Sequence, residues 1–269
     1  MEFARKYGYV ADPKHAEALA KDKHYASRIH AVGVEELPKC SNNISTAPAV
    51  VNQYSLGSCV GNATGAALKH AQIIQKLPDV FFPSRLFIYY NARMTEGTTS
   101  EDNGCCIRNA MKVVAHLGAP PEELWPYDLD KWDKCPAKGA YWEARKHLAV
   151  DYYRVNWSEL DEIKQCLAGG HGIVFGFQVP EHFESKEVER SGVLHMPGKN
   201  EKFRGGHAVY CLDYHDEAIF PSWSKPGGVL VQNSWGEEWG VGGRFWMPYD
   251  YITSPTLSDD FWTIRTVEA

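Results

Sequence analysis

The stretch NQYSLGSC, residues 52–59, runs directly into VGNATGAALKHAQIIQKL, residues 60–77, and these two segments decide the fold. Apolar residues recur with the period of an α-helix, at positions 60, 63, 67, 71 and 74. Several glycines and alanines lie within the same run, which suits a helix packed closely on several sides. Pro78 ends the pattern. We therefore expect a central, buried helix that begins at Cys59.

A cysteine in the first turn of such a helix has distinctive chemistry. The backbone N–H groups of that turn have no partner within the helix, and the helix dipole places positive charge there. Both effects favour the thiolate, which is the nucleophilic form of the side chain. Cys59 is thus a candidate nucleophile, although this segment alone fits equally well a small buried thiol at the start of a packed helix.

A cysteine nucleophile needs a base and a group that orients the base, and candidates for both lie far downstream. The stretch GGHAV, residues 205–209, places His207 at the mouth of an expected strand. The stretch NSWGEEWG, residues 233–240, follows another apolar strand. The side-chain oxygen of Asn233 can accept the imidazole N–H, and a neighbouring Trp can keep water away from that bond.

Taken together, these segments resemble the papain family of cysteine peptidases, including its bacterial and viral branch, from about Pro38 to Asp250. The motifs that carry the resemblance are Gln53 with Cys59, Gly-Ser-Cys at 57–59, Asp-Asn-Gly at 102–104, Leu-Trp-Pro-Tyr at 124–127, Gly-His-Ala-Val at 206–209, and Asn-Ser-Trp-Gly at 233–236 with Trp-Gly at 239–240. Each motif is weak alone, whereas their order and spacing together are specific.

The resemblance implies that Cys59 is the nucleophile, His207 the general acid and base, and Asn233 the residue that orients His207. Gln53 and the backbone N–H of Cys59 would form the oxyanion hole. The implied reaction is peptide-bond hydrolysis through a thioester acyl-enzyme, without a metal or another cofactor. Substrate-binding roles would fall to Gly57, Asn103, Gly104, Cys105, Gly206, Trp235 and Trp239.

The chain departs from the family pattern at the cleft. Leu56 stands where many members have a cysteine, and Asp102 stands where the disulfide partner of that cysteine would be. We therefore expect that disulfide to be absent. Cys105 replaces a glycine, so that its side chain would narrow the substrate cleft.

Composition excludes several other classes of protein. The chain has 269 residues, 44% of them apolar and 23% charged, with a net charge of −6 at pH 7, as in a folded globular protein. The acidic balance and the lack of a Lys/Arg run argue against a nucleic-acid partner. No apolar stretch approaches the ~20 residues that cross a bilayer, so we expect no membrane partner. The expected partner is a peptide or protein substrate, and no oligomeric state follows.

Seven cysteines stand at irregular spacing, at positions 40, 59, 105, 106, 135, 166 and 211. Their odd number and spacing argue against a disulfide scaffold and against a zinc site, so we expect no metal. The N-terminus lacks the apolar stretch of a secretory signal. We expect synthesis inside a cell and a reducing compartment, with non-classical secretion or packaging left open.

Helical patterns dominate the first half of the chain, including segments near 83–90 and 107–116, with Gly118 closing the second. Short β-prone runs follow Trp157, at 173–177, 208–212, 229–232 and 244–247. We expect an α+β fold of the papain type, with a helical lobe over about 50–150, a β-barrel-like lobe over about 151–250 and the cleft between them.

Three segments organise the chain. Residues 1–36 are expected to form an N-terminal extension, either a short propeptide or a segment that covers the cleft, with a helical pattern at 13–20. Residues 37–255 would form the peptidase domain, and residues 256–269 a C-terminal segment packed on it. Two alternatives stay open: a transamidase or amidase that uses the same acyl-enzyme, and a non-catalytic peptide-binding protein of the same fold.

Overall fold

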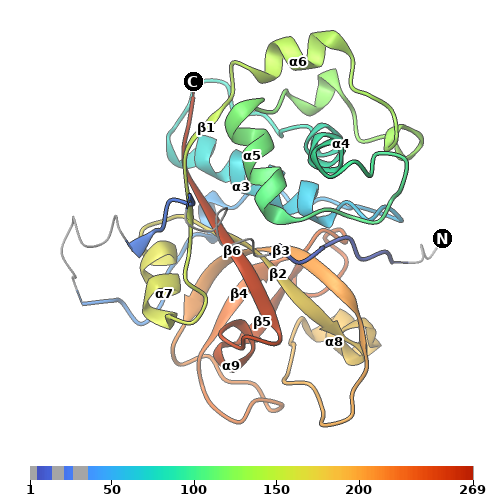
Figure 1. The fold of residues 1–269 in the computed structure, drawn as a ribbon. Helices are drawn as coiled ribbons and strands as arrows, with labels where there is room; N and C mark the ends of the chain where they lie inside the picture. The colour runs from blue at the N-terminus through green and yellow to red at the C-terminus, as the bar shows by residue number, and fades with distance from the viewer. Residues whose placement is uncertain (1–4, 14–20, 27–35, 269) are drawn as a thin grey trace.

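The structure is a computed structural model that describes residues 5–13, 21–26 and 36–268. Two lobes lie one above the other in Figure 1, with helices gathered in the upper lobe and most strands in the lower one. The helical lobe contains α3 (Cys59–Ile74), α4 (Arg85–Glu96), α5 (Ile107–His116) and α6 (Lys138–Ala144). The first half of the chain also forms three short 3-10 turns, η1 (Ile44–Thr46), η2 (Glu122–Leu124) and η3 (Leu129–Lys131). The predicted α+β architecture is confirmed.

Helix α3 is the buried central helix that the sequence predicts, and it begins at Cys59. It packs on α4 and α5 and also on strands of the other lobe. Its small residues allow this close approach, because a β-carbon at Gly61 would lie 2.6 Å from the carbonyl oxygen of Arg85 in α4. The first turn of α3, which carries Cys59, is therefore fixed between the two lobes.

Among the described residues, one antiparallel sheet forms the second lobe, with the strand order β1-β6-β2-β3-β4-β5. The strands are β1 (Ala149–Arg154), β2 (Ile173–Pro180), β3 (Phe203–His215), β4 (Gly228–Gln232), β5 (Arg244–Pro248) and β6 (Ser258–Val267). The helices α7 (Leu160–Ala168), α8 (Lys186–Ser191) and α9 (Tyr249–Ile252) and the 3-10 turn η4 (Glu181–Glu184) lie around the sheet.

The C-terminal segment, which the sequence predicts to pack on the domain, contributes a strand to its sheet. Strand β6 lies inside the sheet, between β1 and β2. The helices α6 to α9 and strand β1 were also not predicted. The helical pattern at 13–20 falls almost wholly outside the described residues.

Residues 5–13, called the covering segment below, run between the two lobes, as the dark blue trace in Figure 1 shows. The N–H of Tyr9 donates to the carbonyl oxygen of Gly206 in β3, at 3.0 Å. The N–H of Cys105, from the helical lobe, donates to the carbonyl oxygen of Gly8, also at 3.0 Å. The covering segment is thus hydrogen-bonded to both lobes at once.

Gly118 closes α5, as predicted, with φ at 73°, and a β-carbon there would lie 1.8 Å from the carbonyl oxygen of Ala144. We expect Gly118→Ala to lower the free energy of unfolding by about 2–4 kcal/mol, because left-handed strain and a backbone clash act together. Gly97 is the matched control: its φ is 74°, but a β-carbon there would meet nothing within 4 Å. Urea unfolding of the two alanine variants separates the effects, and equal losses would contradict the clash.

Candidate active site

Three of the predicted site residues meet between the lobes. Cys59 begins α3, His207 lies in β3, and Asn233 directly follows β4. The Nε2 atom of His207 lies 2.8 Å from the Oδ1 atom of Asn233. The N–H of Ala208, the residue after His207, donates to the Sγ atom of Cys59 at 3.4 Å. A thiol from one lobe therefore contacts the residue that follows the oriented imidazole of the other.

Aromatic rings enclose the imidazole. The ring of Trp235 stacks on that of His207, with centroids 5.1 Å apart and an interplanar angle of 25°. Trp239 packs edge-on against Trp235 and is itself only 2% exposed. His207 is fully buried, and within the described part of the chain its Nδ1 atom has no hydrogen-bond partner. With Nε2 bound to Asn233, Nδ1 is the nitrogen left for proton transfer.

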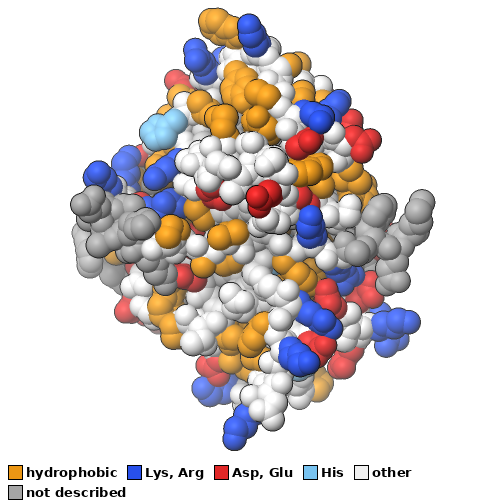
Figure 2. Space-filling model, turned by 45° about the vertical axis from the view of Figure 1, so that its right-hand side comes forward, with side chains coloured by type: hydrophobic (Ala, Val, Ile, Leu, Met, Phe, Trp, Pro, Cys, Tyr) orange, Lys and Arg blue, Asp and Glu red, His pale blue; other side chains and the backbone are white. Residues whose placement is uncertain are grey.

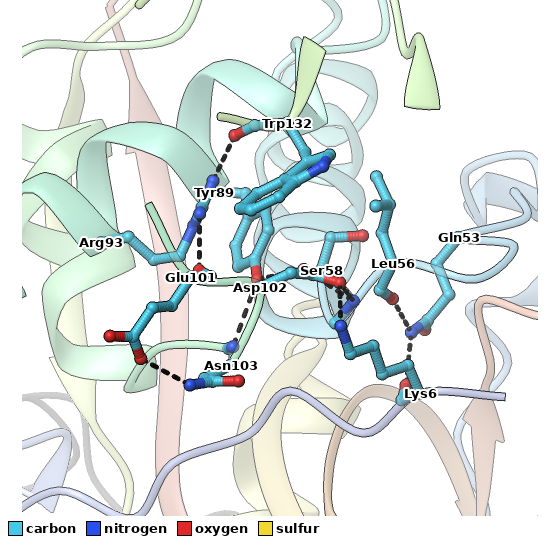
Figure 3. Close-up of polar contacts among 12 residues, drawn as sticks. Lys6, Gln53, Leu56, Ser58, Tyr89, Arg93, Glu101, Asp102, Asn103 and Trp132 are labelled. Carbon is cyan, nitrogen blue, oxygen red and sulfur yellow. Dashed lines mark hydrogen bonds and ion pairs between the residues drawn. The ribbon is translucent and has the colours of Figure 1, made fainter. Parts of the chain in front are cut away.

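The side-chain amide of Gln53 is held from several sides. Its Oε1 atom accepts a hydrogen bond of 2.6 Å from the hydroxyl of Ser234. Its Nε2 atom donates to the carbonyl oxygen of Leu56 at 2.9 Å and to that of Lys6 at 3.1 Å. Figure 3 shows this amide directed at the backbone of Lys6. The predicted oxyanion-hole donor thus already binds a peptide carbonyl, and the carbonyl belongs to the covering segment.

The predicted backbone-binding positions contact the same segment. The N–H of Val10 donates to the carbonyl oxygen of Cys105 at 3.1 Å, so that Cys105 pairs through both of its backbone groups. A β-carbon at Gly8 would lie 1.7 Å from the carbonyl oxygen of Gly57, and one at Gly104 would lie 2.0 Å from that of Gly8. Glycine at these positions is what allows the two backbones to touch.

Two of the predicted substrate-binding residues need separate comment. Asn103 is exposed, and its Nδ2 atom donates to the carboxylate of Glu101 at 2.6 Å, away from Lys6 (Figure 3). The side chain of Cys105 is fully buried in the core cluster that contains α3. The substrate-binding role of Asn103 and the narrowing of the cleft by Cys105 therefore stay predictions.

The covering segment also contacts the aromatic side of the site. The guanidinium of Arg5 lies 4.2 Å from the ring centroid of Trp235, and its Nη2 atom lies 3.4 Å from a carboxylate oxygen of Glu189. The ring of Tyr7 meets His207 edge-on at 5.9 Å, and its hydroxyl donates to Glu184. Trp235 and His207 are therefore covered on this side as well.

Burial sets the protonation of the thiol and the imidazole. It raises the pKa of Cys59 to about 11, against the smaller opposite effect of backbone N–H donors, among them those of Ala208 and Gly8. It lowers the pKa of His207 to about 4, although the hydrogen bond to Asn233 acts in the other direction. Between these two values both groups are neutral, because burial penalises either charged form. The covered site therefore holds a protonated, weakly nucleophilic thiol.

Asp102 has a role that the sequence did not reveal. Its Oδ1 and Oδ2 atoms lie 3.0 and 3.2 Å from the donating N–H of Gly57, and the hydroxyl of Tyr89 donates to Oδ1 at 2.7 Å. The Nζ atom of Lys6 lies 2.7 Å from Oδ2. All seven cysteines are free. The only sign of this role in the sequence is that an aspartate stands where the resemblance to the papain family implies a disulfide.

Within the described ranges, no group of three or more His, Cys, Asp or Glu side chains is placed to hold a metal ion. Among the helices of the described residues, none is long and apolar enough to cross a membrane.

Comparisons with known proteins identify the family and the fold. The sequence model of papain family cysteine proteases matches residues 39–255. A peptidase C1-like protein of Acanthamoeba polyphaga mimivirus is 38% identical over 224 residues, which are 81% of this chain and 70% of the viral protein. The crystal structure of xylellain, a cysteine protease from Xylella fastidiosa, superposes with a TM-score of 0.82 at 35% identity and covers 98% of both chains. A procathepsin B from Trypanosoma congolense shares the fold alone, with a TM-score of 0.72 at 14% identity over 98% of this chain and 87% of that one.

Proposed function

We propose that this chain, which belongs to the papain family of cysteine proteases and is a thiol peptidase, works through Cys59, His207, Asn233 and Gln53. The observation that carries the assignment is the 2.8 Å contact between His207 and Asn233, with the Cys59 thiol bonded to the N–H of the next residue, Ala208. Acyl transfer by cysteine requires a nucleophile, a base and a group that orients the base, and these residues are of the types that supply the three roles.

The proposed reaction begins with proton transfer from the Cys59 thiol to Nδ1 of His207. The thiolate attacks the carbonyl carbon of the scissile bond, and the oxyanion accepts hydrogen bonds from Gln53 Nε2 and from the backbone N–H of Cys59. His207 then protonates the leaving amine as the C–N bond breaks and a thioester forms. Water, deprotonated by His207, attacks the thioester, releases the carboxylic acid product and restores the thiol.

We further propose that the covering segment keeps the enzyme inactive. Three observations support this. The carbonyl of Lys6 takes the Gln53 donor that the oxyanion would use. Gly8 lies against Gly57 so closely that a substrate strand has no room there. Burial raises the pKa of Cys59 and lowers the pKa of His207, which disfavours the charged form of each group. Withdrawal of the segment would let water and substrate in, and the desolvation penalty on the thiolate would fall.

The covering role is tested by alkylation of the full-length protein with iodoacetamide at neutral pH. Cys59 is fully buried with a raised pKa, so we expect slow labelling in the unaltered chain. In a full-length Gly8→Ala chain, the new methyl group clashes with Gly57. We expect Cys59 to be labelled about tenfold faster, or more, in this chain than in the unaltered chain. Peptide mass mapping reports the labelled position.

Cys40 and Cys135 are the internal controls for this experiment. Both are exposed and free, so they should react at the same rate in the two chains. If the labelling rate of Cys59 is the same in the two chains, as it should be for Cys40 and Cys135, the covering role of residues 5–13 is contradicted. The masses of the products, measured with and without an added amine, distinguish hydrolysis from transfer of the acyl group to an amine. When water is the acceptor, the product is a free carboxylate whether or not the amine is present.

A further inference from the structure

Two carboxylates of the N-terminal extension, those of Asp12 and Asp22, are bound by arginines of both lobes. Asp12, in the covering segment, accepts hydrogen bonds from Nε of Arg108 in α5 at 2.7 Å and from Nη2 of Arg154 in β1 at 3.0 Å. Asp22 accepts from Nη1 of Arg108 and, at 3.0 Å, from Nε of Arg154. None of these four side chains is more than 12% exposed. The extension is therefore held on the domain by buried ion pairs.

A third carboxylate, that of Asp260 in β6, meets the same arginines. Its Oδ1 atom accepts hydrogen bonds from Nη2 of Arg154 at 3.1 Å and from the indole N–H of Trp262 at 2.7 Å. Asp260 is fully buried, and its Oδ2 atom has no hydrogen-bond partner among the described residues. The ion cluster, as this group is called below, consists of Asp12, Asp22, Asp260, Arg108 and Arg154. With every carboxylate ionised, it has one negative charge in excess.

A proton on Asp260 removes this excess. The Oδ2 atom can carry the proton without loss of either hydrogen bond at Oδ1. Burial raises the pKa of Asp260 to about 6, and the negative charge of Asp12 acts in the same direction, against the opposite effects of Arg154 and Trp262. The docked cluster therefore favours a neutral Asp260.

The other titratable groups that face Asp260 add no positive charge. Asp259, the preceding residue, is a further carboxylate that raises the pKa of Asp260. The hydroxyl of Tyr9 and the thiol of Cys106 stay neutral, because burial raises the pKa of each. Asp260 thus depends for its ionisation on Arg154, which Asp12 and Asp22 also occupy.

We infer that the ion cluster is a proton-dependent latch for the covering segment, and that the segment docks on the domain with uptake of a proton at Asp260. This inference rests on the proposed covering role and adds its regulation. In the docked state, a neutral Asp260 leaves two carboxylates paired with two guanidinium groups. When Asp12 and Asp22 withdraw, Asp260 remains with two cations and no competing carboxylate from the extension, so its ionised form is favoured.

The direction of the pH effect follows from this difference. In the withdrawn state, the pKa of Asp260 falls to the ordinary value of about 3.9 or below. In the docked state it is about 6. Protonation of Asp260 therefore stabilises the docked state fully below about pH 4, and this contribution is lost as the pH rises to about 6. His207, whose pKa burial lowers, contributes in the opposite direction, so the test compares different chains at one pH.

The attraction that closes the latch is local. The chain has a net charge of −6 at pH 7, so its overall charge repels carboxylates. On the face in Figure 2, the acidic and basic side chains of the described residues are interspersed with one another. The guanidinium groups of Arg108 and Arg154 lie 5.5 and 4.6 Å from the ring centroid of Trp262. This ring holds the two cations together, and they supply the attraction.

The latch is tested by hydrogen exchange of the backbone amides of Tyr9 and Val10, whose hydrogen bonds to the two lobes break when the covering segment withdraws. At pH 7, we expect the full-length Asp260→Asn chain to exchange these amides about 10- to 100-fold more slowly than the unaltered chain. The neutral amide reproduces the charge balance of the protonated carboxyl, and two pKa units correspond to about 100-fold. Asparagine also suits the φ of 62° at this position. At pH 4.5, the two chains should differ by only a few-fold.

Asp22→Asn should have the opposite effect and speed the exchange at pH 7 by at least about tenfold, because it removes a carboxylate that binds both Arg108 and Arg154. Asp213→Asn is the matched control. Asp213 is a buried carboxylate of β3 whose hydrogen bonds lie outside the ion cluster, so its loss should leave the exchange unchanged. If Asp260→Asn sped the exchange or left it unchanged at pH 7, Asp260 would be an ordinary ion-pair partner, and the inference would be overturned.

A titration of the unaltered chain tests the same inference without a variant. The ¹³C shift of the Asp260 carboxyl carbon should change with a midpoint near pH 6. A midpoint at or below pH 4 would overturn the latch. Neither measurement depends on catalysis, so a failure of the proposed function is distinguishable. If Asp260→Asn slowed the exchange but hydrolysed peptides as fast as the unaltered chain, the latch would stand and the covering role would be contradicted.

Discussion

The full-length Gly8→Ala chain is expected to hydrolyse peptides about 10- to 100-fold faster than the unaltered chain, under reducing conditions and at equal protein concentration. The substitution lies in the covering segment and changes no residue of the proposed catalytic group. Initial rates on a fluorogenic peptide measure the effect. The substitution adds one methyl group outside the catalytic residues, so a gain in activity points to release of an inhibitory contact.

The physical reason is a clash between backbones. A β-carbon at Gly8 would lie 1.7, 2.4 and 2.9 Å from the O, C and Cα atoms of Gly57. These are backbone atoms, which cannot turn aside as a side chain can, and the N–H of Gly57 is held by Asp102. Overpacking of this kind costs about 1–3 kcal/mol, which corresponds to a shift of roughly 5- to 150-fold toward the uncovered state.

Gly139→Ala is the matched control for this prediction. Gly139 is exposed in α6, and a β-carbon there would meet nothing within 4 Å, so the same substitution should leave the activity unchanged. If Gly8→Ala lowers activity, or leaves it unchanged while the fold persists by circular dichroism, the covering segment is not an inhibitor. The direction of the change therefore decides the question.

Much of the site could be predicted because it lies in or beside elements that the sequence pattern indicates. Cys59 begins a helix whose apolar period and terminal proline are visible in the sequence, and the structure starts α3 at that residue. His207 and Asn233 stand beside short β-prone runs that became β3 and β4. The prediction that these distant segments meet rested on the resemblance to the papain family. No local sequence pattern specifies a contact between residues 149 positions apart, such as Cys59 and Ala208.

Other parts of the fold depend on pairings that leave a weak local signal. Strand β1 pairs with β6, joining Ala149 to Val267, and its burial pattern has no clean alternation of buried and exposed residues. Strand β6 contains Asp260, which has φ at 62° and is fully buried. A charged residue in that conformation argues against a strand when only the sequence is read. These two strands were therefore missed.

Asp102 shows how a departure from a family pattern can be read physically. The resemblance to the papain family implies a disulfide at this place, and in this chain the two acceptor atoms of Asp102 hold the N–H of Gly57 instead. The replacement is compatible with a reducing environment, because a carboxylate does not depend on redox state. It also introduces a negative charge beside the oxyanion-hole donor, which a disulfide cannot supply.

In the Gly8→Ala background, Cys59→Ala is expected to abolish hydrolysis, with kcat/KM reduced by at least about 10⁴-fold. The substitution removes the atom that would form the thioester, and Gln53 and His207 alone cannot form a covalent intermediate. Hydrolysis of the peptide at saturating and at limiting substrate measures kcat and kcat/KM. Binding of the peptide, followed by fluorescence anisotropy, should persist, because the donors and the cleft remain.

Cys211→Ala is the control that separates chemistry from packing. Cys211 is also fully buried and lies in β3, the strand that carries His207, but it belongs to the core of the strand lobe. Loss of its sulfur should cost about 1 kcal/mol of stability and leave kcat nearly unchanged. If the two cysteine variants lost activity to the same extent, the defect would be one of folding. A loss confined to Cys59→Ala assigns the nucleophile, because burial, residue type and the size of the deleted group are the same at both positions.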